Sequence, residues 1–189
     1  NNISTKIEMV ANTKENVIMP QGKNIVLDVD GFKISSENET PTITINGKCN
    51  LINSKTGTIS ESVVSITNTG VKINSTGEFI LGTNENGSEL NVSTTTPVIK
   101  GKIYGIQVEE NGKFKFYDGK IIAPVDEDET KFGHKAIYGT NPEKENSTTG
   151  NKDVYETPQK YIVNIEKDEN GNEIATLAKT YVITFDADG

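Results

Sequence analysis

The chain alternates apolar and polar residues in short runs, and these runs predict strands. In residues 24–35, NIVLDVDGFKIS, the side chains of Ile25, Leu27 and Val29 alternate with their neighbours. A period of two places one set of side chains on a single face of a strand. Similar runs recur along the first two thirds of the chain without helical periodicity, so we expect an all-β fold.

The runs form an internal repeat. Each unit has an apolar pair, a polar turn ending in Gly, a second apolar pair and a second Gly turn. The clearest units are 43–59 (ITINGKCNLINSKTGTI), 64–81 (VSITNTGVKINSTGEFIL) and 106–122 (IQVEENGKFKFYDGKII). Their turn glycines are Gly47 and Gly57, Gly70 and Gly77, and Gly112 and Gly119. With further units at 86–103 and 24–35, the predicted period is roughly 18–23 residues.

A strand-rich repeat of this length predicts a right-handed, single-stranded parallel β-helix, in which stacked coils share one core. Sharp corners between the strands would explain the glycines. We expect one interior column formed by Ile25, Ile45, Ile66, Val92 and Val108. The main alternative is a β-sandwich, because Asn-Gly pairs, which favour tight hairpins, also recur.

The pattern changes after Pro124 and predicts four segments. Residues 1–139 form the β-helix, in which 135–139 is the last rung. Residues 140–159 are polar, and their composition predicts a loop or linker. Residues 160–179 contain an Asn-Gly turn at 170–171 and predict a C-terminal hairpin that caps the open end of the solenoid. Residues 180–189 predict the first strand of a following repeat domain.

The charge of the chain argues against a nucleic-acid partner. Its 189 residues carry 19 basic side chains, all of them Lys, and the net charge is −8. Binding to phosphates requires clustered basic residues, which this acidic chain lacks. No apolar run approaches the ~20 residues of a membrane span, so we expect no membrane insertion by this segment. We also find no signal peptide and interpret the chain as a piece of a larger protein.

The segment ENVIMPQGKNIVLDVDGFKI (15–34) resembles the opening coil of β-helical modules in large surface proteins of Gram-positive bacteria. The Gly-turn coils that follow and FKFYDGKI (114–121) fit the same group, so the resemblance covers roughly residues 7–122. It implies a pectate-lyase-like fold and an adhesin-type role. Separately, YVITFDADG (181–189) is similar to the first strand of the internalin-type B-repeat, also called the Listeria–Bacteroides repeat, which occurs in tandem in wall-anchored bacterial proteins.

Asp28 and Asp30 are the first candidates for chemistry. They lie two residues apart in a predicted strand, and β-helical hydrolases act through clustered carboxylates. Asp30 directly precedes Gly31, however, and an Asp before Gly suits a corner where its side chain bonds nearby backbone. We interpret the two residues as part of a corner and of a solvated strand face. A cation site and a catalytic pair remain the alternatives.

Other residues offer weaker signals. Polysaccharide lyases with the pectate-lyase-like fold use Arg or Lys as a base. Arg is absent from this chain. Nothing in the sequence around Lys23 or Lys48 indicates the burial that would lower the pKa of a lysine. The alternation of Cys49 with Leu51 predicts that Cys49 carries a buried, inert thiol. We expect His134, the only histidine, to lie in a loop. Acidic stretches at 126–129 and 168–173 lack EF-hand spacing. Five tyrosines could stack on sugars if they share a face: Tyr104, Tyr117, Tyr138, Tyr155 and Tyr161.

We therefore assign no catalytic, cofactor-binding or metal-binding residue and expect no cofactor. The sequence predicts a non-catalytic, secreted module of a bacterial cell-surface protein, anchored to the cell wall through regions outside this segment. Its loops would bind a glycan or a host-matrix protein, and we expect a monomer. The alternatives are a carbohydrate-active enzyme (a polysaccharide lyase or hydrolase), a passive spacer and a trimeric tail-fibre segment. The enzyme hypothesis requires Asp28, Asp30 and another carboxylate to converge in a groove within ~5–10 Å.

Overall fold

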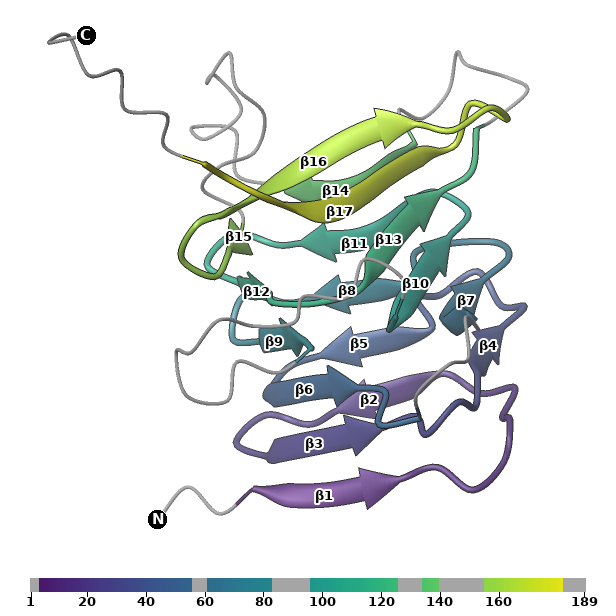
Figure 1. The fold of residues 1–189 in the computed structure, drawn as a ribbon. Helices are drawn as coiled ribbons and strands as arrows, with labels where there is room; N and C mark the ends of the chain where they lie inside the picture. The colour runs from purple at the N-terminus through teal and green to yellow at the C-terminus, as the bar shows by residue number, and fades with distance from the viewer. Residues whose placement is uncertain (1–3, 56–60, 83–95, 126–133, 140–154, 182–189) are drawn as a thin grey trace, which may run out of the picture.

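A computed structural model describes residues 4–55, 61–82, 96–125, 134–139 and 155–181. These residues form strands and connecting turns, and the strands belong to three sheets that run the length of the molecule (Figure 1). From β2 to β15 the chain visits the sheets in turn, so that every third strand returns to the same sheet one level higher. Neighbouring coils pair in parallel, which confirms the predicted β-helix and excludes the sandwich.

We name the sheets A, B and C. Sheet A contains β1 (Thr5–Glu8), β3 (Asn24–Asp28), β6 (Lys48–Ile52), β9 (Glu78–Leu81), β12 (Lys113–Phe116) and β15 (Tyr155–Glu156). Sheet B contains β4 (Ile34–Ser36), β7 (Glu61–Ser65), β10 (Val98–Gly101), β13 (Lys120–Ala123), β17 (Glu173–Lys179) and β16 (Tyr161–Lys167). Sheet C contains β2 (Val17–Met19), β5 (Ile43–Ile45), β8 (Val71–Ile73), β11 (Tyr104–Val108) and β14 (Lys135–Gly139).

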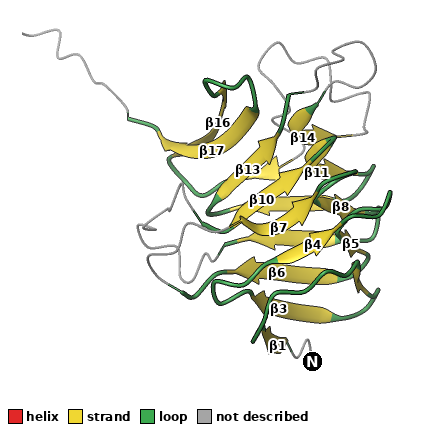
Figure 2. Cartoon of the chain, turned by 90° about the vertical axis from the view of Figure 1, so that its right-hand side faces the viewer, coloured by secondary structure: helices red, strands yellow, loops and turns green. Residues whose placement is uncertain are grey.

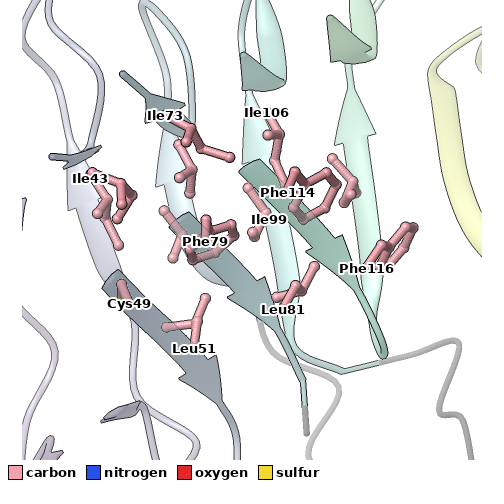
Figure 3. Packing of buried hydrophobic residues seen from close by; sticks show 14 of the residues in the cluster. Ile43, Cys49, Leu51, Ile73, Phe79, Leu81, Ile99, Ile106, Phe114 and Phe116 are labelled. Carbon is pink, nitrogen blue, oxygen red and sulfur yellow. The ribbon is translucent and has the colours of Figure 1, made fainter. Parts of the chain in front are cut away.

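The core consists of vertical rows of apolar side chains, one residue from each coil. In sheet A, Cys49 lies beneath Phe79, which lies beneath Phe114, and the two phenylalanine rings stack with their centroids 5.9 Å apart (Figure 3). In sheet C, Ile43 lies beneath Val71 and Ile106 in the same way. Because each coil hides the apolar side of the coil below it, almost all of these side chains are buried.

The predicted interior column is wrong in part. Ile25 belongs to a row of sheet A, whereas Ile45 and Val108 belong to one row of sheet C, with Ile73 between them. Ile66 follows β7 and points to solvent, with 57% of its surface exposed. Val92 lies outside the described residues. The error arose because a period of two identifies an inward face but does not say which of three sheets that face belongs to.

The length of the repeat also differs from the prediction. Cys49 and Phe79 are 30 residues apart, and Phe79 and Phe114 are 35 apart. The corner between sheets C and A is formed by Gly47, Gly77 and Gly112, so Gly70, which enters β8, is not equivalent to Gly47. At Gly47 and Gly77 an added Cβ would overlap a backbone carbonyl of the coil below, at Pro20 and Ile45 respectively.

The C-terminal hairpin is present as predicted. β16 and β17 pair antiparallel, and β17 pairs antiparallel with β13, so the hairpin extends sheet B at the top of the stack (Figure 1). Its turn carries Gly171 at φ 82°. Ala175 and Leu177 are buried against the core, which closes this end. β14 forms the expected rung at 135–139, and β15 adds one more strand to sheet A within the segment predicted as a linker.

Candidate functional site

Asp28 and Asp30 lie at the corner that follows β3. The Asp28 side chain has no exposed surface, so the prediction that it lies on a solvated face is wrong. Its Oδ1 accepts hydrogen bonds from the backbone N–H groups of Asp30 (3.1 Å) and Ser54 (3.0 Å). Its Oδ2 lies 3.1 Å from Nζ of Lys6 on β1. Asp28 therefore joins three successive coils, since β1, β3 and β6 are neighbours in sheet A.

The environment of Asp28 stabilises its ionised form. Burial by itself would raise the pKa of this carboxyl, but hydrogen bonds from Ser54, Lys6 and the Asp30 N–H outweigh it, so the pKa lies below its usual value. Asp30 itself adopts φ 43° and accepts a hydrogen bond from the Ser54 hydroxyl (3.3 Å). The corner interpretation is therefore correct for both residues. With its surface covered, Asp28 has no direct access to a substrate.

A concave surface lies elsewhere among the described residues, on the outer face of sheet B. It is a groove of about 810 Å³ that crosses β4, β7 and β10, which Figure 2 shows stacked one above another. Outward-facing residues occupy one row of this face: Ser35 pairs with Val64, and Val64 pairs with Lys100. The groove also includes residues 12–14 of the first coil at one end and Pro124 at the other. We call this surface the sheet B groove.

The sheet B groove combines an aliphatic floor with polar and basic walls. Val64 and the exposed Ile66 supply the apolar part, and hydroxyl groups come from Thr13 and Ser35, whereas Ser36 and Ser65 are buried. Four lysines and two glutamates also line it: Lys14, Lys33, Lys100, Lys102, Glu37 and Glu61. The groove is thus locally basic on a chain whose net charge is −8.

Two of these lysines are held by ion pairs. Nζ of Lys14 lies 3.0 Å from Glu37, and Nζ of Lys100 lies 3.1 Å from Glu61. Among the described residues, Lys33 and Lys102 make no ion pair. Their charges therefore remain available to an incoming anionic or hydroxyl-bearing group. Sequence reasoning missed this site, because its residues come from five successive coils and only the stacking register brings them together.

The remaining sequence candidates do not assemble into one site. Cys49 is buried in the core, and burial raises the pKa of its thiol to about 12, which confirms the inert-thiol prediction. Nδ1 of His134 lies 2.9 Å from the carbonyl oxygen of Pro124, in a connection between β13 and β14. Lys48 is ion-paired with Glu78 (3.1 Å), and Lys23 lies in an exposed turn before β3.

The tyrosines are divided among different surfaces. Tyr104 and Tyr138 stack on sheet C, with ring centroids 4.3 Å apart and planes 6° from parallel. The hydroxyl of Tyr117 donates to Glu156 at 2.7 Å, and Tyr155 and Tyr161 pack against the core near the capped end. The five rings therefore do not form a shared platform. Tyr104 and Tyr138 are the tyrosine pair that stacks among the described ring contacts.

The structure describes one of the two acidic stretches, 168–173. Residues 126–129 lie outside the described residues. At 168–173, Asp168 accepts hydrogen bonds from the N–H groups of Asn170 and Asn172 and from the Asn172 amide, all at 2.9 Å, and so shapes the hairpin turn. Over the described part of the chain, no three His, Cys, Asp or Glu side chains gather closely enough to hold a metal ion. Over the same part, no helix has the length and apolarity needed to span a membrane.

Comparisons of the chain with protein-family models, with curated proteins and with solved structures find no match.

Proposed function

We propose that this chain is a non-catalytic, extracellular module of a bacterial cell-surface protein that binds a glycan through the sheet B groove. The single observation that carries the proposal is the groove itself, an extended concave surface on a rigid β-helix. Backbone ladders between coils hold its residues at a constant spacing of roughly 4.8 Å per coil. A preformed surface of this kind binds without a large ordering cost.

The chemistry of the groove suits a sugar chain better than a flat apolar partner. Hydroxyl groups of Thr13 and Ser35 match the hydrogen-bonding groups of a carbohydrate, and Val64 and Ile66 match its C–H faces. Lys33 and Lys102 add charges that could bond sugar oxygens or carboxylates. The resemblance of the first coils to Gram-positive surface modules supports the extracellular location and wall attachment through other regions of the protein.

The proposal is tested by binding of the purified chain to immobilised glycans and to host-matrix proteins. The double variant Lys33→Glu/Lys102→Glu and the single variant Ile66→Asp should each weaken glycan binding by about tenfold or more, because they place repulsive or poorly matched charge in the groove. The matched controls are Lys23→Glu/Lys113→Glu and Ile162→Asp, which alter exposed residues on other surfaces.

Three results would contradict the proposal. One is the absence of binding to any glycan. A second is equal loss of binding in the groove variants and the controls. The third is conversion of a bound polysaccharide into fragments, since that would require catalysis.

A further inference from the structure

The charges that line the sheet B groove do not balance. Both of its glutamates are neutralised by neighbouring lysines, at 3.0 Å and 3.1 Å. Among the described residues, Lys33 and Lys102 have no carboxylate within ion-pairing distance. Both side chains are half-buried, so the surface holds part of each aliphatic stem. The groove therefore carries unbalanced positive charge at two fixed places, on a chain whose net charge is −8.

The two unpaired lysines lie on different coils. Lys33 directly precedes β4, and Lys102 directly follows β10, two coils higher (Figure 2). In the register of sheet B, Ile34 aligns with Val63, and Val63 aligns with Ile99. Lys33 lies one residue before this level and Lys102 three residues after it. At ~4.8 Å between strands and ~3.3 Å per residue, roughly 16 Å separate their Cα atoms. The two charges therefore face different units of a sugar chain.

The surface between these lysines is uncharged or internally balanced. Ser35 and Val64 are neighbours in the outward-facing row of sheet B, and Ile66 is exposed one coil below Lys102. The next member of the row, Lys100, is already paired with a glutamate. A ligand segment that covers this stretch needs hydroxyl and C–H groups, because a charge there would meet no partner.

The charge of the whole chain limits how acidic the ligand can be. A protein with a net charge of −8 repels a polymer that carries a dense row of negative charges. The chain also lacks Arg, whose planar fork binds sulfate and phosphate groups through two hydrogen bonds. Two separated ammonium groups instead suit a ligand whose charges are equally sparse.

We propose, on the basis of the glycan-binding function above, that the sheet B groove selects an acidic glycan in which carboxylate-bearing sugars alternate with uncharged sugars. Lys33 and Lys102 bind carboxylates on two separate sugars. Ser35, Val64 and Ile66 contact the uncharged part of the chain between them. The ammonium–carboxylate contacts supply the preference for the acidic glycan over a neutral one.

Hyaluronan is a suitable probe, because it alternates a uronate with an uncharged N-acetylated sugar. Its methyl ester has the same backbone without the charge. At about 50 mM NaCl the wild type should bind hyaluronan at least about tenfold more tightly than the ester, and this preference should shrink at about 500 mM NaCl because salt screens the lysines. Equal affinity for the two polymers would overturn the inference while leaving the glycan-binding function in place.

Neutralising the two lysines tests their role. Lys33→Gln/Lys102→Gln keeps two polar side chains and removes both charges, so it should weaken hyaluronan binding about tenfold and leave binding of the methyl ester unchanged. Unchanged ester binding also shows that the variant is folded. The matched control, Lys23→Gln/Lys113→Gln, removes two charges from exposed positions outside the groove and should keep the wild-type preference. Equal effects of the two double variants would overturn the inference.

Two further polyanions distinguish selection from general attraction to negative charge. Heparin, which is densely sulfated, and polyglutamate, which has no sugar, should each bind more weakly than hyaluronan. Equal or tighter binding of either would overturn the inference, because it would show that the lysines attract any polyanion. Failure to bind hyaluronan, its ester or any other glycan would contradict the glycan-binding function itself.

Discussion

The ammonium group of Lys6 lies 3.1 Å from the buried carboxylate of Asp28, and this contact ties the first strand of sheet A to the strand above it. The same carboxylate accepts two backbone hydrogen bonds, from Asp30 and Ser54. A residue that resembles half of a catalytic pair in the sequence is therefore a structural link between coils.

Replacing Asp28 by alanine should destabilise the fold. The N–H groups of Asp30 and Ser54 would lose their acceptor in a covered corner, at a cost of about 1–3 kcal/mol. The measurement is the free energy of unfolding in urea. Asp30→Asn is the control, because Asn tolerates the positive φ of this position as Asp does, and the Asp30 carboxylate accepts a longer bond, from the Ser54 hydroxyl (3.3 Å), and should matter less. Equal losses in the two variants would contradict the role assigned to Asp28.

The Asp28 carboxylate should also make the free energy of unfolding depend on pH in the acidic range. The pKa of Asp28 is lower in the folded protein than its ordinary value of 3.8, so the unfolded chain binds a proton more readily in this range. Its stabilising contribution is therefore complete above that value and is lost as the pH falls below it, through the folded pKa. The free energy of unfolding of the wild type should fall more steeply than that of Asp28→Asn below about pH 4. Parallel curves for the two proteins would contradict this prediction.

Ile45→Asp should unfold the protein or cost several kcal/mol. Ile45 is fully buried in sheet C between Met19 and Ile73, so the substitution places an unpaired charge among stacked aliphatic side chains. Ile18→Asp is the matched control, because Ile18 lies on the adjacent strand β2 but is 65% exposed. Thermal unfolding followed by circular dichroism compares them. A melting temperature of Ile45→Asp close to that of the control would show that the inward face is wrongly assigned.

Gly77→Ala should also be destabilising, although Ala is smaller than most residues. A Cβ at Gly77 would overlap the carbonyl oxygen of Ile45 in the coil below, so two coils would have to separate at this corner. We expect a loss of about 1–3 kcal/mol, as for other overpacked sites. Ser75→Ala, at an exposed position of the same corner, should change stability by less than about 0.5 kcal/mol. Urea unfolding of both variants distinguishes the two effects.

The thiol of Cys49 should resist labelling in the folded protein. It has no exposed surface, and its pKa is raised to about 12, so neither access nor ionisation favours reaction. Reaction with a thiol-specific disulfide reagent at neutral pH should be at least ~1,000-fold slower than that of free cysteine. The rate should become normal in denaturant. Rapid labelling of the native chain would show that this part of the core is open.

Much of the architecture could be predicted from local patterns. Alternation around Leu27 and Ile45 identified buried strand faces, because side chains of a strand point alternately to its two sides. The Asn-Gly turn at 170–171 identified the capping hairpin, because a tight turn requires a positive φ. Both features depend on only a few consecutive residues.

The sequence by itself thus determined the class of fold, its inward strand faces and its capped C-terminal end. Only the tertiary structure decided which residues stack on one another, as the exposed position of Ile66 and the shared corner of Gly47 and Gly77 show. The sheet B groove and the burial of Asp28 also follow from that stacking. The physical reason is that the register between coils depends on turns of unequal length, whereas a period of two carries no information about which coil lies above.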